Sequence, residues 1–335
     1  MLRRAFLLTA VAASVAVLAG CATNDQSVVS PEGKDAHDIA TLWWVMLVGS
    51  VVVLAVVLVL VAIVLIRRRG TTRPPELQRD GRSWTWVPVV GGIVIPTIVL
   101  AGLFALTLGT LSSTSPASAG RPALTVQVTG RQWFWDVSYP AAHVRTANEI
   151  HIPVGVPVRI EVSSGDVIHS FWVPELDRKI DMIPGRTSSV TLEAVHRGTY
   201  RGQCAEFCGL QHANMSFLVV AEPRDAFDTW LEGQSKPARP PPTAALERGQ
   251  QVLLGSGCVY CHTIAGTNAS GKVGPDLTHL ASRRFVGAGV VPNSPGNLAG
   301  WIIDPQHMKP GNRMPGTDLT GPQLQDLLDY LESLR

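Results

Sequence analysis

From residue 204 to residue 215 the chain reads CAEFCGLQHANM, which places two thiols, an imidazole and a thioether within twelve positions. These ligand types together favour copper, because a structural zinc site takes four strong ligands and gains little from methionine. Cys204 and Cys208 alone could form a disulfide or a buried pair, but His212 and Met215 at these spacings argue against that interpretation. The stretch therefore predicts a copper-binding loop, which still needs a second imidazole.

The segments around this loop predict the domain that carries it. Short runs rich in β-branched and aromatic residues alternate with turn residues at 124–129, 132–138, 156–162, 167–173, 188–193 and 216–220. An antiparallel sandwich or barrel of about 100 residues fits this pattern. His169 lies on one of the expected strands, and it is the candidate for the second imidazole, supplied from a neighbouring strand.

The composition of the whole chain indicates a membrane protein. Of its 335 residues, 46% are hydrophobic and only 16% are charged, which is too apolar and too long for one ordinary soluble domain. Two uncharged segments, 42–66 and 86–111, are each longer than the ~20 residues that a helix needs to cross a bilayer. We therefore expect a transmembrane hairpin over 37–112. Its short connection is rich in arginine, which predicts a cytoplasmic location for that connection and an outer location for everything after Leu111.

The N-terminus is typical of an export signal. Residues 1–20 carry Arg3 and Arg4, followed by an apolar run that is too short to span a bilayer. The run ends in LAGC, which resembles a bacterial lipoprotein signal and implies cleavage before Cys21 and lipidation of that residue. A plain signal peptide or an uncleaved anchor is the alternative. In each case the N-terminus starts on the outer face of a bacterial inner membrane.

A second soluble module is expected beyond a proline-rich segment. Residues 223–243 contain the run KPARPPP, a composition that stays extended and so predicts a linker. The string CVYCH then matches the C-x-x-C-H motif of c-type haem attachment, in which the thiols of Cys258 and Cys261 bond to the porphyrin and His262 binds the iron. In an exported chain this motif predicts a covalently bound haem c, carried by a module over 244–335.

The copper string and its surroundings resemble the CuA domain of cytochrome c oxidase subunit II. The resemblance rests on HSF at 169–171, on CAEFCGLQHANM and on QWFW at 132–135, and it runs from the hairpin to about residue 222. It implies an all-β cupredoxin-like sandwich over 121–222 and a binuclear copper centre. The implied ligands are Cys204 and Cys208 as bridges, His169 and His212 as one cap each, Met215 as a weak ligand, and Glu206 through its backbone carbonyl.

The same resemblance carries two further implications. The side chain of Glu206 would bind magnesium at the interface with the catalytic subunit. Trp133 matches the tryptophan through which electrons enter the copper centre, although it could also be an ordinary strand aromatic. The chain departs from the family where many members carry a glutamate at the mouth of a proton path, since Gly81 stands there, with Glu76 or Asp80 as possible substitutes. The sequence therefore does not predict which residue of this chain would take up protons.

Residues 244–335 resemble a small, all-α class I cytochrome c. The string GPDL at 274–277 matches the family segment whose proline carbonyl accepts a hydrogen bond from the haem-ligating histidine, here His262. The Pro-Gly-x-x-Met spacing of the family assigns the sixth haem ligand to Met314, with Met308 as its rival. His279 and His307 are also possible axial ligands, but we expect both to be surface residues, because single loop histidines are usually solvated.

Together these resemblances imply the electron-entry subunit of a membrane-bound haem–copper terminal oxidase. It would pass electrons from its own haem c to CuA and on to subunit I, where oxygen is reduced, because neither span of this chain carries a histidine that could hold haem. Subunit III and an upstream cytochrome c or bc1-type complex are further expected partners.

Three other classes of protein fit the sequence less well. Nitrous oxide reductase has a similar copper string but carries a large propeller domain and no hairpin. Quinol oxidase subunit II shares the lipoprotein signal and hairpin but lacks the copper ligands. A copper carrier that uses a C-x3-C pair would explain neither Met215 nor Trp133 nor the haem motif.

Charge is balanced over the chain and within each soluble module. The 28 basic and 26 acidic residues give a net charge of +2, so a nucleic-acid role is not expected. Residues 121–222 hold nine basic and ten acidic residues, and residues 243–335 hold seven of each. Opposed charges therefore supply little steering between the two modules. We expect the linker instead to make their encounter intramolecular, so that electron transfer between them depends weakly on salt and not on dilution.

Overall fold

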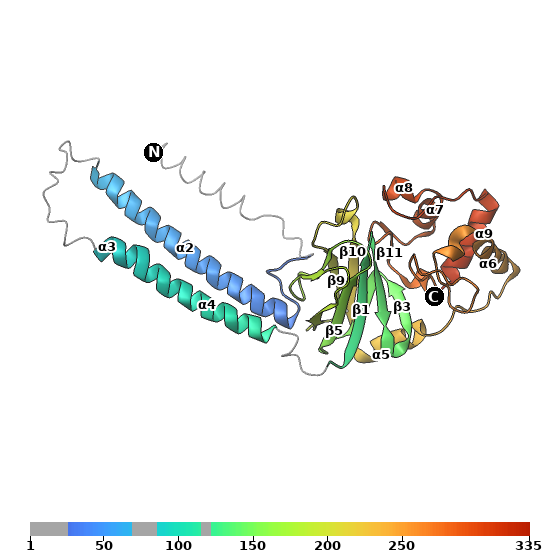
Figure 1. Cartoon of the computed structure of the whole chain (residues 1–335), viewed down its shortest axis with the longest axis horizontal. Coiled ribbons are helices and arrows are strands. Elements are labelled where there is room, and N and C mark those ends of the chain that lie inside the picture. Colours follow the sequence, from blue (N-terminus) through green and yellow to red (C-terminus); the bar gives the residue numbers. More distant parts are fainter. Residues whose placement is uncertain (1–25, 69–85, 115–121) are drawn as a thin grey trace, which may run out of the picture.

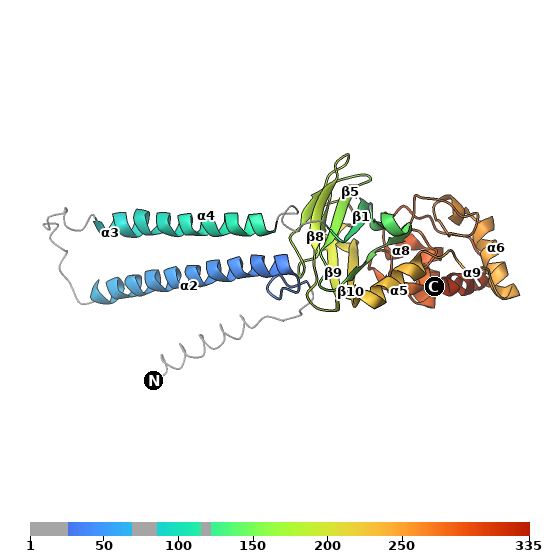
Figure 2. The ribbon, with the colours of Figure 1, turned by 90° about the horizontal axis from the view of Figure 1, so that it is seen from below.

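The computed structural model describes residues 26–68, 86–114 and 122–335. They form a pair of long helices, a β-sandwich and a small helical module, arranged in that order along one axis (Figures 1 and 2). This arrangement confirms the expected fold class. The expected signal segment 1–20, Cys21 and Gly81 lie outside the described residues, as does most of the arginine-rich connection.

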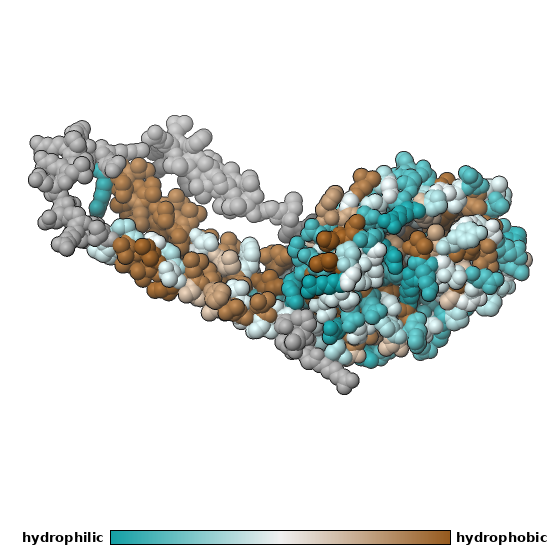
Figure 3. All heavy atoms as spheres, in the orientation of Figure 1, coloured by the Kyte–Doolittle hydropathy of each residue, from teal (hydrophilic) through white to brown (hydrophobic). Residues whose placement is uncertain are grey.

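Two apolar helices form the N-terminal part. α2 (Lys34–Arg68) is one of them, and the other consists of α3 (Trp86–Val89), the π-helical turn η1 (Val90–Val94) and α4 (Ile95–Ser113). The π-helical turn precedes Pro96, which has no N–H to donate to the helix ladder, so the regular spacing is lost there. Both helices are long and apolar enough to cross a membrane, and the most apolar window of each is entirely unburied. Figure 3 shows their apolar surface in brown. The two expected spans are therefore helices of membrane-crossing length.

Two five-stranded sheets pack face to face to form the sandwich. In spatial order, the first sheet consists of β3 (Val144–Ala147), β2 (Phe134–Tyr139), β1 (Leu124–Arg131), β5 (Val158–Ser164) and β8 (Ser188–Leu192). The second consists of β4 (Glu149–Pro153), β10 (Ser216–Glu222), β9 (Gly198–Cys204), β6 (His169–Trp172) and β7 (Ile180–Met182). Alternate side chains of the strands point inward, as a half-buried sheet requires. Trp135 of the first sheet meets Phe171 and Phe217 of the second, and these three aromatic rings fill the core.

The strand pairing differs from the sequence prediction in two respects. β1 pairs with β5, and β10 with β4, in parallel, so the expectation of a purely antiparallel sandwich is wrong. Both parallel pairs arise because the chain crosses between the sheets before it returns. The strands β3, β4, β7 and β9 were not predicted. Three of them are five residues or shorter, and β9 carries two glycines and an arginine, which weakens its β-pattern.

The expected linker over 223–243 is wrong for its first half. Residues Arg224–Gln234 form the amphipathic helix α5, which packs on the sandwich through Phe227 and Trp230. The ring of Trp230 stacks on His151 at a centroid distance of 3.9 Å. The proline-rich second half lies along the helical module, where the amide of Ala238 donates to the carbonyl of Ala265. The connection is therefore bound to both modules.

The C-terminal module is built around two crossing helices, α6 (Ala244–Gly255) and α9 (Gly321–Ser333). Gly249 permits their close approach, since a Cβ there would lie 1.9 Å from the carbonyl oxygen of Asp326. Leu327, Leu328 and Leu331 of α9 are buried in the core of this module. The remaining elements are η4 (Gly257–Tyr260), η5 (Leu280–Ser282), the hairpin β11 (Phe285–Val286) and β12 (Val291–Pro292), α7 (Pro295–Ile303) and α8 (Pro305–Met308).

Candidate copper and haem sites

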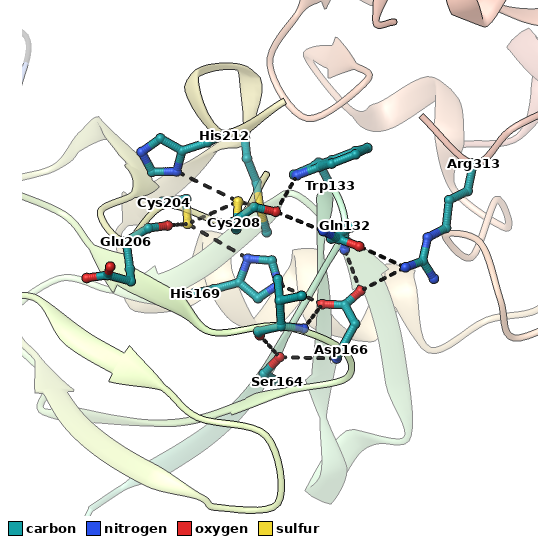
Figure 4. Close-up of polar contacts among 12 residues, drawn as sticks. Gln132, Trp133, Ser164, Asp166, His169, Cys204, Glu206, Cys208, His212 and Arg313 are labelled. Atoms are coloured by element: carbon teal, nitrogen blue, oxygen red, sulfur yellow. Dashed lines mark hydrogen bonds and ion pairs between the residues drawn. The ribbon is translucent and has the colours of Figure 1, made fainter. Parts of the chain in front are cut away.

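Five candidate copper ligands converge at one end of the sandwich, and Figure 4 labels the two cysteines and the two histidines among them. The Sγ atoms of Cys204 and Cys208 lie 3.7 Å apart. Nδ1 of His169 lies 3.8 Å from Sγ of Cys204, and Nδ1 of His212 lies 3.7 Å from Sγ of Cys208. Sδ of Met215 lies 3.8 Å from Sγ of Cys208. Each thiol therefore faces its own imidazole, and the thioether closes the cluster on one side.

Strand pairing sets these positions. β6 begins at His169 and β9 ends at Cys204, and the two strands are antiparallel with Phe171 opposite Cys204. Both ligands therefore lie at the same end of the second sheet. The loop that follows returns to this point, because the amide of Cys204 donates to the carbonyl of Met215 over 2.9 Å. Within that loop the short 3-10 helix η3 (His212–Asn214) carries the second imidazole.

The carbonyl of Glu206 adds a sixth group to the cluster. Its oxygen lies 3.2 Å from Sγ of Cys204. The carboxylate of the same residue is exposed and points away from the sulfur atoms, as Figure 4 shows. The backbone and the side chain of Glu206 are thus available to two different sites.

The two thiols do not form a disulfide. Both are free and buried, and 3.7 Å is far beyond the ~2.05 Å of an S–S bond. The contact between the two sulfur atoms lowers the pKa of Cys204 to about 3 and raises the pKa of Cys208. One negative charge is therefore easily held here, whereas a second one needs a nearby cation. A set of two thiols, two imidazoles, a thioether and a carbonyl fits soft-metal ions such as copper.

His169 is held by a carboxylate behind it. Its Nε2 lies 2.8 Å from Oδ1 of Asp166, so that Nδ1 is turned toward Cys204. Burial lowers the pKa of His169, but the bonds with Cys204 and Asp166 outweigh it and raise the pKa overall. Burial raises the pKa of Asp166, yet the bonds from the amide of Gln132 and from His169 lower it overall. Such an outer partner fixes the orientation of a ligating imidazole.

Trp133 lies one hydrogen bond from the cluster. Its Nε1 donates to the carbonyl of Cys208 over 3.0 Å, and Nε2 of Gln132 donates to the same oxygen over 2.9 Å (Figure 4). A strand was expected from residue 132, but β2 begins at Phe134, and these two residues form the turn between β1 and β2. The tryptophan is half-buried in that turn and is not a core aromatic of a strand.

The haem motif lies in the C-terminal module. Nδ1 of His262 lies 2.8 Å from the carbonyl oxygen of Pro275, which confirms the expected hydrogen bond. This contact leaves Nε2 as the nitrogen for an iron ligand. Burial lowers the pKa of His262, which favours the neutral, metal-binding form. Cys258 lies in the 3-10 turn η4 and Cys261 directly follows it, and both are free thiols.

The two candidate methionines have different surroundings. The side chain of Met308 packs at Gly300, where an added Cβ would lie 2.6 Å from its Cε. The backbone of Met314 is held by the amide side chains of Asn312 and Gln306. Neither contact assigns the sixth ligand, which stays a prediction.

One of the two histidine expectations in this module is wrong. His279 is 5% exposed and its Nε2 lies 3.0 Å from the carbonyl oxygen of Lys236, so it anchors the linker instead of facing solvent. His307 is exposed, as expected.

Several residues at the site were missed by sequence reasoning. Asp166 could have been suspected from the sequence, because a metal-binding histidine often bonds to a carboxylate through its other ring nitrogen. Lys309 and Arg313 could not, because nothing local to their sequence shows which part of the sandwich they contact.

The family model "Cytochrome C oxidase subunit II, periplasmic domain" matches residues 141–222, and the model "Cytochrome c" matches residues 246–335. The chain is 35% identical to cytochrome c oxidase subunit 2 of Alkalihalophilus pseudofirmus over 76% of this chain and 72% of that protein. It is 30% identical to cytochrome c oxidase subunit 2 of Bacillus sp. strain PS3, over 95% of this chain and 94% of that one.

Among solved structures, the periplasmic domain of cytochrome oxidase subunit II of Bradyrhizobium japonicum is 32% identical. The match covers 35% of this chain and 96% of that one, with a TM-score of 0.34.

Proposed function

Because the chain belongs to the cytochrome c oxidase subunit 2 family and carries a cytochrome c domain, we propose that it is the electron-entry subunit of a haem–copper terminal oxidase. In this proposal electrons pass from a haem c on residues 244–335 to a binuclear copper centre on residues 121–222. From there they pass to subunit I, where oxygen is reduced. This chain contributes the relay and not the oxygen-reducing site.

The copper centre is proposed on the six converging groups. Their convergence around two thiols 3.7 Å apart is the observation that carries the proposal. A bridged copper pair supplies a one-electron relay whose charge is shared between two metal ions. The protein supplies rigidity, because His169 and Cys204 lie on paired strands and need to move little between redox states. In the proposed assignment Cys204, Cys208, His169 and His212 would hold the two ions, and Met215 and the Glu206 carbonyl would be weak ligands.

The haem is proposed on Cys258, Cys261, His262 and Met314. The thiols would attach the porphyrin, and His262 would bind the iron through Nε2, since its Nδ1 already bonds to Pro275. Methionine ligation would raise the potential of this haem, which makes it a better acceptor of electrons from an upstream donor. Trp133 is the proposed point of entry to the copper centre, supported by its hydrogen bond to the carbonyl of Cys208.

The remaining proposals concern the setting of the chain in the complex. The exposed carboxylate of Glu206 would bind magnesium at the interface with subunit I. Subunit III and an upstream cytochrome c or bc1-type complex are the other proposed partners. The hairpin over 37–112 would lie in a bacterial inner membrane with both soluble modules on the outer face, and Cys21 would carry a lipid anchor. The apolar helices and the arginine-rich connection support this orientation.

Metal analysis and electron paramagnetic resonance of the purified full chain test the function. We expect a mixed-valence copper pair and one covalent haem c per chain. Cys204→Ser should abolish the copper signal and leave the haem absorption spectrum intact, because the two sites lie in separate cores. A single labile copper ion would contradict the proposal and favour a copper carrier. Joint loss of copper and haem would contradict the division of sites.

A further inference from the structure

A buried lysine joins the two modules beside the copper site. Lys309, in the segment after α8, is 1% exposed. Its Nζ donates to the carbonyls of Trp133 over 2.8 Å, Asn214 over 2.7 Å and Gly287 over 2.7 Å. The first two carbonyls belong to the sandwich. The third belongs to the β11–β12 turn of the C-terminal module (residues 244–335), which carries the proposed haem site and is called the haem module below. One side chain therefore connects the entry tryptophan, the loop before Met215 and two segments of the haem module.

The three acceptors suit a charged lysine. Burial lowers the pKa of Lys309 to about 7. Three carbonyl oxygens, however, match the three N–H donors of an ammonium group, whereas a neutral amine offers only two. Hydrogen bonds from a charged donor are also the stronger ones.

The β11–β12 turn makes a second, independent contact. Gly287, Ala288 and Gly289 all have positive φ angles, of 67°, 63° and 84°. The carbonyl of Ala288 accepts hydrogen bonds from both the amide and the hydroxyl of Ser216, at 3.1 and 3.0 Å. A Cβ on Gly289 would lie 2.0 Å from Oγ of Ser216. The turn therefore fits closely against the residue that follows the proposed ligand Met215.

The segment that leads to Met314 contacts the same end of the sandwich. Gln211 donates to the carbonyl of Pro310 over 2.6 Å. Arg313 donates to Oε1 of Gln132 over 2.8 Å, and Figure 4 shows it reaching from the haem module toward Gln132 and Asp166. The proposed haem ligand thus follows directly on a segment that is fixed to the copper domain.

We propose that Lys309 is a positioning residue for haem-to-copper electron transfer, which holds the 306–314 segment and the β11–β12 turn against Trp133 so that transfer crosses a fixed interface. This inference rests on the proposed function. It replaces the expectation of a tethered module that meets the copper domain by repeated encounters. In the transfer step one electron leaves a ferrous haem iron, which becomes ferric, and enters the copper pair, and no bond is made or broken.

The kinetic test uses the full chain with haem and copper bound. After flash reduction of the haem, the rate of copper reduction in the wild-type protein should not change with solvent viscosity, because no docking step precedes transfer. In Lys309→Ala the rate of copper reduction should fall by about tenfold or more, because small displacements of reacting groups can lower a rate by that much. It should also become viscosity-dependent. The matched control is Lys236→Ala, whose exposed ammonium pairs with Glu232 on α5.

A second readout does not depend on electron transfer. Amide hydrogen exchange should show protection of residues 212–216 and 285–290 in the wild-type chain, since the Ser216 amide donates across the interface. Lys309→Ala should lose that protection with the haem and copper spectra unchanged, whereas Lys236→Ala should keep it. If Lys309→Ala does not fold, the rate of copper reduction in the wild-type chain at increasing viscosity still shows whether the two modules share a fixed interface or meet by repeated encounters.

The outcomes separate the inference from the proposed function. Absence of copper, haem or any internal transfer in the wild-type chain would overturn the function. Internal transfer that slows with viscosity in the wild-type chain would overturn the fixed interface. A Lys309→Ala chain with wild-type rate and wild-type exchange would overturn the role of this lysine and leave the function intact.

Discussion

Oδ1 of Asp166 lies 2.8 Å from Nε2 of His169, and Oδ2 of the same carboxylate accepts the amide of Gln132 over 2.7 Å. One carboxylate thus links a proposed copper ligand to the turn that carries Trp133. The carboxylate of Asp166 therefore holds both the ring of His169 and the turn at Gln132 and Trp133.

Asp166→Asn should weaken copper binding. An amide cannot accept as strongly from the imidazole, and loss of such a partner typically lowers metal affinity by about 10–100-fold. The loss would appear in a competition titration with a copper chelator, with the haem spectrum unchanged. Asp228→Asn on α5 is the control, because that carboxylate is exposed and pairs only with Arg224 among the described contacts. Equal copper affinity in both variants would show that Asp166 does not orient His169.

Replacement of the two methionines of the haem module should have different effects. Met314→Leu should lower the haem potential and open the sixth coordination position, because a thioether ligand raises the potential of c-type haems. Met308→Leu should do neither, because the Pro-Gly-x-x-Met spacing assigns the sixth ligand to Met314. Redox titration and carbon monoxide binding distinguish the two variants. Carbon monoxide binding by the Met308 variant alone would reverse the assignment.

α5 should detach from the sandwich as pH rises. Burial lowers the pKa of His151, but its contacts with the carboxylates of Glu149 and Glu222 raise it overall. A histidine whose folded-state pKa is raised stabilises the fold fully below its unfolded pKa of about 6.5. That contribution is lost as pH rises through the folded-state pKa. Since His151 stacks on Trp230, the loss should be local to this helix.

Hydrogen exchange of residues 224–234 between pH 6 and 9, corrected for the intrinsic effect of pH on exchange, measures this change. His151→Gln should remove the pH dependence. His196→Gln, at a largely exposed histidine that pairs with Glu32, is the control. A helix equally protected at both ends of the pH range in the wild-type chain would contradict the prediction.

Gly249→Ala should destabilise the haem module. The new methyl group would lie 1.9 Å from the carbonyl oxygen of Asp326, so α6 and α9 must separate. Overpacking of this kind costs about 1–3 kcal/mol. Thermal unfolding followed by the haem absorption measures the cost. Gly255→Ala, at the end of the same helix, has open space around its Cβ and should unfold at or near the wild-type temperature. Identical melting of the two variants would argue against close α6–α9 packing.

The amino-acid sequence by itself determined the parts of this protein that depend on neighbouring residues. The loop 204–215 and the CVYCH string could be read directly, because a ligand set or an attachment motif needs its residues at fixed short spacings. The two long apolar helices followed from uninterrupted hydrophobic runs, since bilayer thickness sets their length.

Only the tertiary structure decided which distant residues meet. The pairing of β6 with β9 brings His169 to Cys204, although 34 residues separate them in the chain. The helical first half of the expected linker folds because the sandwich offers a face for Phe227 and Trp230, and composition alone does not reveal that face. Lys309 carries no local signal at all. Its three acceptors are backbone carbonyls, which every residue possesses, and only the packing of two modules turns them toward one ammonium group.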